Sequence, residues 1–191
     1  MNNIDKAVKV LQDGGIVIYP TDTVFGIGCR IDDEKGVKRL FKLKNRSEKQ
    51  AVPVLVDSLE MAKKYARVPV DVENRLIKRF WPGALTIIFY STRDDISGLV
   101  IGDRNTIGLR MPNQMVLLEI IKALGVPIIG TSANIHGKTS AIHLDDLDPK
   151  LINSVDLVIP GEVKERISST IIDSTKNPWQ ILRQGTVKVS I

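Results

Sequence analysis

The sequence predicts an α/β fold, an open twisted sheet of mixed parallel and antiparallel strands with flanking helices. Two observations lead to this prediction. Short apolar strands alternate with amphipathic helices early in the chain, whereas strands follow one another directly towards its end. Several strands also run straight into loops rich in Ser, Thr, Asn and Arg, and ligands gather at strand ends in open α/β sheets. Several of these loops are therefore expected to line one cleft.

Apolar spacing, helix caps and Gly or Pro stops predict the elements in order. Helices are expected from Ile4 to Leu11, after a cap at Asp32 or Asp33, after Ser58, from Pro69 to near Phe80, from Val116 to Leu124, and around Asp145 and Asp146. Strands are expected at residues 16–19, 52–56, 85–90, 106–110, 126–131, 155–159, 170–172, 180–182 and 187–189.

Composition limits the class of protein. A net charge of +5 and a hydrophobic share of 43% fit one globular domain over residues 1–191. The apolar runs are far shorter than a bilayer span and the N-terminus lacks a signal-peptide pattern, so we expect a cytoplasmic protein without membrane association. A single cysteine excludes an intramolecular disulfide, and with two histidines a structural zinc site is not expected. The positive charge favours an anionic partner such as nucleotide, phosphate or RNA.

Two loops in the first third suit a polar or anionic ligand. Thr21, Asp22 and Thr23 follow a strand and precede two glycines, which allow close backbone approach to a substrate. Lys44 and Arg46 follow a helix, and phosphate recognition favours Arg as a bidentate fork and Lys as a point charge. Taken alone, the first group also suits a turn and the second an exposed basic surface.

Two later strands carry similar groups. In residues 106–110, period-two alternation places Thr106, Gly108 and Arg110 on one face and the two apolar residues in the core. An arginine beside a small residue suits a carboxylate or phosphate, although a solvated sheet face has the same pattern. Ser132 and Asn134 follow an apolar strand, where small polar residues favour contact with a ligand, and a plain turn is the alternative.

The last third adds polar residues at 168–170 before a strand and Arg183 at the end of another, and neither is specific alone. The sequence has no P-loop and no convincing dinucleotide-binding pattern, so a bound ATP needs a less common type of site. His136 and His143 have no triad-like partners in the sequence, and Cys29 fits a small buried residue better than a nucleophile.

Seven short motifs follow one another between residues 19 and 185, within a pattern that covers nearly the whole chain, from about residue 4 to residue 187. They are Tyr19-Pro20-Thr21-Asp22-Thr23-Val24-Phe25-Gly26, Lys44-Asn45-Arg46, Trp81-Pro82-Gly83-Ala84-Leu85-Thr86, Gly108-Leu109-Arg110-Met111-Pro112, Ser132-Ala133-Asn134, Ser169-Thr170 and Leu182-Arg183-Gln184-Gly185. Any one motif is weak, but together, in this order and spacing, they resemble the YrdC-type threonylcarbamoyl-AMP synthase family.

The resemblance implies a YrdC-like single domain with a concave basic cleft. It also implies a nucleotidyltransferase that makes threonylcarbamoyl-AMP and pyrophosphate from L-threonine, bicarbonate or CO2, and ATP with Mg²⁺. In that family a tRNA threonylcarbamoyl-transferase complex receives the product, as the next step in modifying an adenosine of tRNA. The basic charge is compatible with an RNA contact.

Carried over residue by residue, the resemblance implies a set of site residues. The L-threonine site is assigned to Thr23, Arg110, Ser132 and Ser169, with Arg110 on the carboxylate. The nucleotide site is assigned to Lys44, Arg46, Gln50, Thr106, Asn134, Ser140 and Arg183, and catalysis to Lys44 and Arg46. No residue is assigned as a metal ligand.

The chain departs from the family pattern at several positions. Ser47 replaces a usual proline and Gln50 an asparagine. Leu55 stands where some members have a histidine that contacts threonine. His136 and Ile142 replace a serine and a threonine that contacts the nucleotide, so the detailed ligand contacts are expected to differ.

The implied chemistry needs a closed cleft, because the carbamate of threonine is unstable in water. Attack of its oxygen on the α-phosphorus depends on positioning and positive charge, and we assign no general base.

One alternative is a non-catalytic double-stranded RNA or tRNA-binding module, which has no need for the hydroxyls of Thr23, Ser132 and Ser169. Another is the related domain of hydrogenase-maturation carbamoyltransferases, which usually occurs in much longer chains with zinc-finger-like cysteines.

Overall fold

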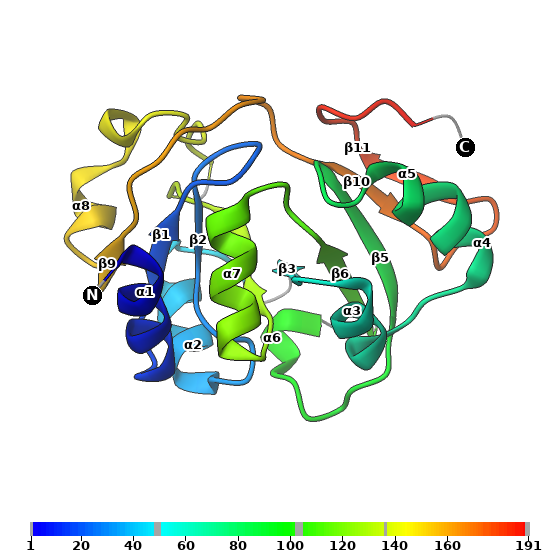
Figure 1. The fold of residues 1–191 in the computed structure, drawn as a ribbon, viewed down its shortest axis with the longest axis horizontal. Helices are drawn as coiled ribbons and strands as arrows, with labels where there is room; N and C mark the ends of the chain where they lie inside the picture. Colours follow the sequence, from blue (N-terminus) through cyan, green and yellow to red (C-terminus); the bar gives the residue numbers. More distant parts are fainter. Residues whose placement is uncertain (1, 48–50, 102–104, 136, 190–191) are drawn as a thin grey trace.

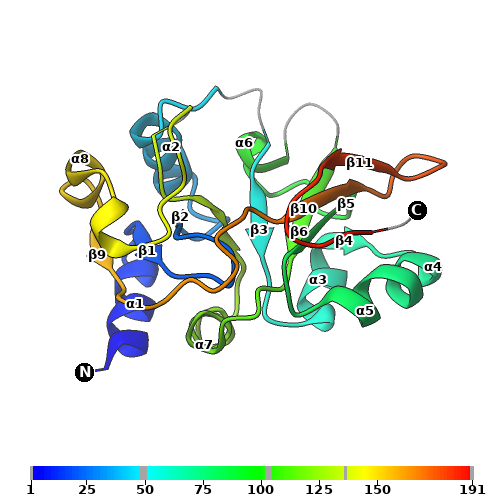
Figure 2. The ribbon, with the colours of Figure 1, turned by 90° about the horizontal axis from the view of Figure 1, so that it is seen from above.

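The computed structural model describes residues 2–47, 51–101, 105–135 and 137–189. Its strands form two open sheets, each with parallel and antiparallel pairs, and helices flank both (Figure 1). This confirms the predicted class of an α/β fold with mixed pairing. The strands expected to share one sheet are divided between two, and Figure 2 shows these at opposite ends of the molecule.

The smaller sheet combines strands from the two ends of the sequence. β1 (Val17–Tyr19) pairs antiparallel with β2 (Gly26–Gly28) and parallel with β9 (Leu157–Val158), and β8 (Thr131–Ser132) pairs with the other side of β2. β1 is buried throughout, as expected of its unbroken apolar run. The sequence did not predict β2, because two of its three residues are glycines, which are depleted in strands.

These two glycines leave space for the Tyr19 side chain and for the carbonyl of Ile129, which belongs to the larger sheet. A Cβ on Gly26 would lie 2.4 Å from Cε2 of Tyr19, and one on Gly28 would lie 1.8 Å from the carbonyl oxygen of Ile129. The Tyr19 hydroxyl donates a 2.5 Å hydrogen bond to that same carbonyl. Burial raises the pKa of Tyr19, so the hydroxyl keeps its proton and remains a donor.

The larger sheet holds the remaining strands. In order across it they are β11 (Gln180–Arg183), β10 (Thr170–Asp173), β5 (Leu85–Ser91), β6 (Thr106–Arg110), β3 (Pro53–Leu55) and β7 (Ile128–Ile129), with β4 (Ala66–Arg67) beside β5. The strand predicted at 187–189 is absent from the described part of the chain. Side chains bind its first carbonyl instead, since Thr170 Oγ1 and Gln184 Nε2 donate to the oxygen of Val187 at 2.6 Å and 2.8 Å.

The prediction of one strand over 126–131 was wrong, because this stretch contributes to both sheets. β7 pairs with β3 in the larger sheet, and β8 pairs with β2 in the smaller one. Gly130 lies between them and donates its N–H to the carbonyl of Pro53 at 2.8 Å. A Cβ on Gly130 would lie 2.4 Å from Cγ of Leu55, so this close approach needs glycine. We call residues 128–132 the crossing segment.

The helices begin at the predicted caps. The carboxylate of Asp33 accepts from the N–H of Lys35, the Ser58 hydroxyl accepts from the N–H of Met61, and Gly125 ends a helix with φ of 69°. The helices are α1 (Asn3–Gln12), α2 (Glu34–Leu43), α3 (Leu59–Tyr65), α4 (Val70–Val72) with a π turn (Glu73–Ile77) leading to α5 (Lys78–Phe80), α6 (Gly98–Ile101), α7 (Met115–Leu124), a 3₁₀ turn (Leu144–Asp146) and α8 (Pro149–Ile152).

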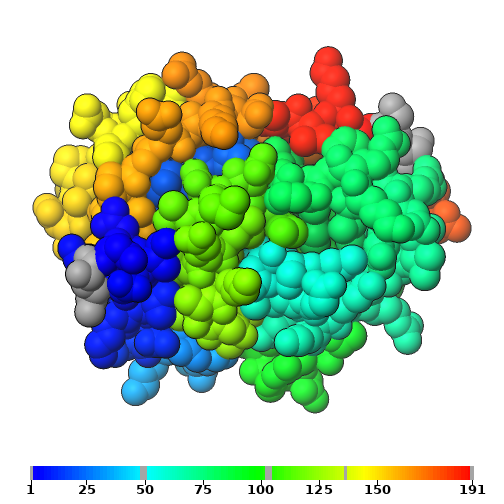
Figure 3. Space-filling view, viewed as in Figure 1, coloured from blue at the N-terminus to red at the C-terminus, as the bar shows by residue number. Residues whose placement is uncertain are grey.

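The hydrophobic core lies between the sheets and these helices. α7 packs against α1, and Figure 3 shows α7 crossing the middle of the face between the N-terminal part, in blue, and α3, in cyan. Within the described ranges, no helix is both long and apolar enough to cross a bilayer.

The packing around β2 predicts that adding a side chain at Gly28 destabilises the fold more than adding one at an open glycine. The change Gly28→Ala places a Cβ against the Ile129 carbonyl and beside the Tyr19 hydroxyl, 2.9 Å away. We expect it to lower the free energy of unfolding by about 3 kcal/mol, the upper end of the usual cost of overpacking. Urea denaturation followed by circular dichroism measures this. Gly98→Ala is the matched control, because no atom lies within 4 Å of its added Cβ; equal effects of the two changes would contradict the prediction.

Candidate functional site

A cavity of ≈ 220 Å³ lies where the two sheets meet. Its walls come from the β1–β2 loop, from β3, β5 and β6, from the crossing segment, and from residues next to β10 and β11. The cavity brings together seven of the site residues predicted from the sequence. These are Thr23, Arg46, Thr106, Arg110, Ser132, Ser169 and Arg183.

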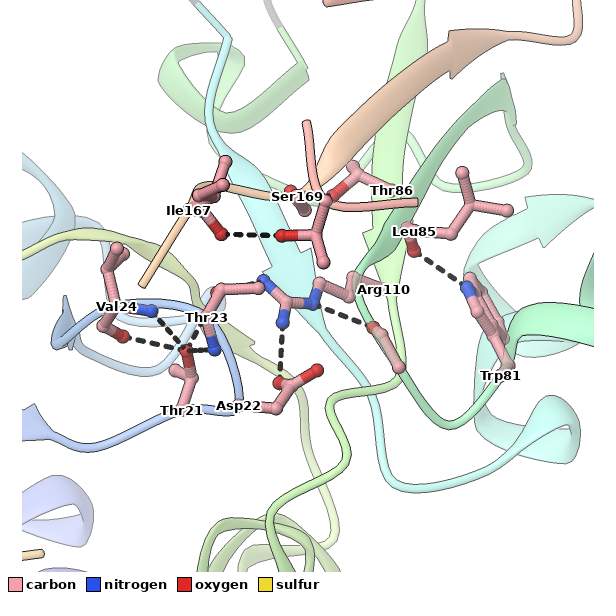
Figure 4. A network of polar contacts seen from close by, with 12 residues as sticks. Thr21, Asp22, Thr23, Val24, Trp81, Leu85, Thr86, Arg110, Ile167 and Ser169 are labelled. Carbon is pink, nitrogen blue, oxygen red and sulfur yellow. Dashed lines mark hydrogen bonds and ion pairs between the residues drawn. The ribbon is translucent and has the colours of Figure 1, made fainter. Parts of the chain in front are cut away.

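Arg110 ends β6, and its guanidinium is buried in the cavity wall (Figure 4). Each of its nitrogens donates to a different partner. Nε donates to the Gly83 carbonyl at 3.0 Å, Nη1 to the Thr23 hydroxyl at 2.9 Å, and Nη2 to the carboxylate of Asp22 at 2.5 Å. A guanidinium has five N–H groups, so these bonds fix its plane while using three of them. Desolvation lowers the pKa of Arg110, and Asp22 opposes that effect.

The β1–β2 loop is organised by Thr21, whose role the sequence did not reveal. Its Oγ1 accepts from the N–H groups of Thr23 and Val24 at 3.0 Å and 3.2 Å, and donates to the Val24 carbonyl at 2.7 Å. A hydroxyl has one proton, so in the 2.9 Å contact between the two threonine hydroxyls Thr23 is the donor. The Thr23 oxygen therefore accepts from Arg110 and keeps a lone pair that accepts, but has no proton for a ligand.

A second group of contacts forms around Ser169. Arg183, the last residue of β11, donates from Nε and Nη2 to the Ser169 carbonyl at 3.0 Å and 2.8 Å, and Nη2 lies 3.2 Å from the Ser169 hydroxyl. The Ser169 hydroxyl also lies 3.0 Å from that of Thr86 on β5. Figure 4 shows Thr86 and Ser169 side by side above Arg110.

The charges around the cavity favour an anion. Three arginines, Arg46, Arg110 and Arg183, are among its described lining residues, which include no Asp or Glu. Desolvation lowers the pKa of Arg46 and of Arg183, and the charge of Arg110 lowers that of Arg183 further. Partly buried cations that repel one another are stabilised by an anionic ligand.

Lys44 is placed differently from Arg46. It follows α2 directly, and its side chain is only 2% exposed, beneath the turn after β8 rather than in the cavity wall. Its Nζ donates to the carbonyls of Ser132 and Asn134 at 2.5 Å and 2.6 Å and to Oδ1 of Asn134 at 3.2 Å. Desolvation, with a smaller effect of Arg46, lowers the pKa of Lys44 to about 8.

The remaining predicted residues do not line the cavity. Asn134 lies beside Lys44 and is held by it, and Ser140 is not among the lining residues. Gln50 lies outside the described residues, as does His136. Leu55 is buried in the core, where it packs against Gly130, and is not among the lining residues. The assignments of Lys44, Gln50, Asn134 and Ser140 to the nucleotide stay predictions.

Thr86 is a lining residue to which the sequence assigned no role, although a signal was present. β5 alternates between Leu85, Ile87 and Phe89 in the core and Thr86 and Ile88 at the cavity. Period-two alternation thus indicates that Thr86 points to the same face of the sheet as Ile88, away from the core residues of β5. Gly108 and Arg110 of the neighbouring strand β6 line the cavity on that face. Thr131 and Ser168, which belong to polar segments noted in the sequence but were assigned no role, also line the cavity.

Comparisons with known proteins agree with this fold. The family model Sua5_yciO_yrdC, described as telomere recombination, matches residues 9–185. The threonylcarbamoyl-AMP synthase of Pyrococcus abyssi is 32% identical over 94% of this chain, which spans 53% of that protein. The structure of P. abyssi Sua5 complexed with L-threonine superposes with a TM-score of 0.89 at 31% identity, covering 95% of this chain and 54% of that one.

Two single-domain relatives match over most of their length. The threonylcarbamoyl-AMP synthase of Vibrio vulnificus is 28% identical over 97% of this chain and 100% of that protein. The crystal structure of Escherichia coli YciO has a TM-score of 0.87 at 25% identity, covering 97% of this chain and 90% of that one. The family match over residues 9–185 confirms the resemblance carried by the seven motifs: the chain belongs to the Sua5/YciO/YrdC family.

Proposed function

We propose that this protein is a threonylcarbamoyl-AMP synthase, a nucleotidyltransferase that converts L-threonine, bicarbonate or CO2, and ATP into threonylcarbamoyl-AMP and pyrophosphate. The observation that carries the proposal is the cavity between the sheets, where three arginines and the hydroxyls of Thr23 and Ser169 line one space. Relatives from P. abyssi and V. vulnificus that match nearly the whole of this chain bear the name of this activity.

The donors and acceptors around Arg110 suit an amino acid. Its guanidinium has two N–H groups beyond the three that the described residues accept, and a carboxylate takes such paired donors well. Thr23 beside it has an acceptor lone pair and no free proton, which suits the amine or hydroxyl of threonine. Ser169 provides a further hydroxyl in the lining of the same cavity. This part of the cavity is therefore our proposed L-threonine site.

The nucleotide is proposed to lie towards Arg46 and Arg183. Both guanidiniums line the cavity, whose described lining residues include no carboxylate, so this part of the cavity suits phosphate oxygens. Thr106 on β6 lines the same space, and we keep Asn134, Ser140 and Gln50 as predicted nucleotide contacts. Mg²⁺ is proposed to enter with ATP, held by phosphate oxygens, waters and at most one or two carboxylates, where it would neutralise phosphate charge. Asp22 is not among the described lining residues, and its Oδ1 accepts from Arg110 beside the proposed L-threonine site.

The proposed reaction needs few reactive side chains. The neutral amine of threonine attacks the carbon of CO2 or bicarbonate to give a carbamate, with release of a proton in the case of CO2 and of water in the case of bicarbonate. A carbamate oxygen then attacks the α-phosphorus of ATP, and pyrophosphate leaves. The protein contributes by keeping the carbamate from water, by aligning it with the phosphate, and by stabilising the leaving charge with Arg46 and Arg183.

The product is a mixed anhydride, which must pass to an acceptor before water destroys it. We propose that a tRNA threonylcarbamoyl-transferase complex consumes it on an adenosine of tRNA. The burial of Thr23 and Ser169 inside a cavity favours a small-molecule site over a non-catalytic RNA-binding module, since duplex RNA is read from exposed surfaces.

The proposed activity is tested by pyrophosphate release. The protein is incubated with ATP, Mg²⁺ and bicarbonate, together with one amino acid at a time. We expect release that requires L-threonine and falls at least tenfold with L-serine or L-valine, because a missing methyl or hydroxyl loses about 1–3 kcal/mol of contact in a fitted site. Release that does not depend on the amino acid would count against the proposal.

The carboxylate role of Arg110 is tested without leaving a buried charge unpaired. In the double variant Asp22→Asn with Arg110→Met, both members of the ion pair are neutral, so the fold is spared the cost of an isolated ion. We expect the KM for threonine to rise by about 100-fold, as for loss of one partner of a charge pair. The affinity for ATP should change far less.

Asp22→Asn alone is the control, because it keeps the Arg110 guanidinium. Its KM for threonine should stay within a few-fold of the wild type. If the double variant had a wild-type KM, the carboxylate assignment would be wrong.

The hydroxyl of Thr86 should matter through Ser169. Thr86→Val keeps the shape but removes the contact with the Ser169 hydroxyl. We expect the KM for threonine to rise about fivefold, which corresponds to one hydrogen bond of about 1 kcal/mol. Thr86→Ser keeps the hydroxyl and should restore the wild-type value. Equal behaviour of the two variants in steady-state kinetics would show that packing, not the hydroxyl, is what Thr86 provides.

A further inference from the structure

Lys44 uses its whole ammonium group inside the protein. An ammonium has three N–H donors, and three oxygens accept from Nζ: the Ser132 carbonyl, the Asn134 carbonyl and Asn134 Oδ1. The side chain is 2% exposed and does not line the cavity. In this arrangement Lys44 has no N–H left for a phosphate.

The turn that Lys44 holds would be unfavourable without a cation. Two backbone carbonyls and one amide oxygen converge on a single point, so their partial negative charges repel one another. The N–H of Asn134 donates to the Ser132 carbonyl at 2.9 Å, which also tightens the turn. A buried ammonium at the centre turns this convergence into three charge-assisted hydrogen bonds.

The 132–134 turn also sets the direction of the Ser132 hydroxyl. Asn134 Oδ1 accepts from Lys44 and from Ser132 Oγ at 2.6 Å, while Asn134 Nδ2 donates to the carbonyl of Lys138. Because the one proton of Ser132 is used on Asn134, its oxygen faces a ligand as an acceptor only. Ser132 lines the cavity, so Lys44 acts on the ligand through Asn134 and Ser132.

We propose that Lys44 is a positioning residue, which holds the 132–134 turn so that Ser132 accepts a hydrogen bond from the substrate, and which makes no direct phosphate contact. This role deepens the proposed function and rests on it for the identity of the substrate, L-threonine. It differs from the sequence-based expectation, in which Lys44 and Arg46 together contact the phosphates.

The charge state of Lys44 gives this role a pH dependence. Its surroundings are the neutral oxygens of Ser132 and Asn134, and the charged group that acts on it is Arg46, which lowers its pKa further after desolvation, to about 8. Below that pH the ammonium donates to all three oxygens. As the pH rises through 8 the amine loses one donor, and the turn loses one of its bonds. Threonine binding should therefore weaken above pH 8.

The first experiment is a double-mutant cycle with Lys44→Met, Asn134→Ala and both together, measuring the KM for threonine. We expect Lys44→Met to raise KM about tenfold, since buried carbonyls are left unsatisfied. The double variant should be no worse than the worse single variant, because the two residues act in one chain. If the fold-increases in KM of the two single variants multiplied in the double variant, the proposal would be overturned.

The second experiment compares the binding of ATP and of AMP to Lys44→Met. A positioning role predicts that both affinities fall by the same factor, because the loss does not depend on the β- and γ-phosphates. A loss at least tenfold greater for ATP would show a direct phosphate contact and overturn the proposal. Arg46→Met is the matched control and should lose ATP selectively.

The third experiment does not depend on the folding of the methionine variant. Lys44→Arg keeps a charge at every accessible pH, so the rise of the threonine KM between pH 7.5 and 9 should be smaller than in the wild type. Identical pH profiles would overturn the proposal. Wild-type protein that binds neither threonine nor ATP would instead refute the proposed function, so the two failures are distinguishable.

Discussion

The ion pair between Arg110 and Asp22 connects the two sheets at the cavity. Arg110 comes from β6 of the larger sheet, and Asp22 from the β1–β2 loop of the smaller one. Their side chains are 7% and 6% exposed, so the pair is largely removed from water, which is costly unless hydrogen bonds complete it. Thr23 and the Gly83 carbonyl provide those bonds. The pair thus sets the spacing of the sheets where ligands are proposed to bind.

The region where the two sheets meet also holds other polar groups of the site. The crossing segment joins β3 to β2, and Tyr19 binds its Ile129 carbonyl from the smaller sheet. Directly after it comes the turn that Lys44 holds. The buried side chains of this region are satisfied by hydrogen bonds, since the described residues include no buried side-chain nitrogen or oxygen without a partner. The site is therefore arranged before any ligand arrives, which lowers the entropic cost of binding.

Local patterns predicted most strands and helix caps because these depend on neighbours in sequence. The alternation in residues 106–110 and the caps at Asp33 and Ser58 are of this kind. The division into two sheets is different in kind. The change of sheet occurs at Gly130, where the close approach of Leu55, a residue distant in sequence, leaves no room for a Cβ. Likewise, the spacing of Lys44 and Arg46 predicted two cations that both bind phosphate. In the structure Lys44 donates instead to three oxygens of Ser132 and Asn134, outside the cavity lining. Motifs name candidate residues, but hydrogen-bond direction needs the fold.

The crossing segment also limits how this protein can move. Its backbone is bonded into both sheets, since β7 pairs with β3 of the larger sheet and β8 pairs with β2 of the smaller one. A rigid-body rotation of one sheet against the other would break backbone hydrogen bonds of this segment, and buried backbone groups without partners are costly. Hinge closure of two lobes is thus disfavoured as a way to enclose the substrates.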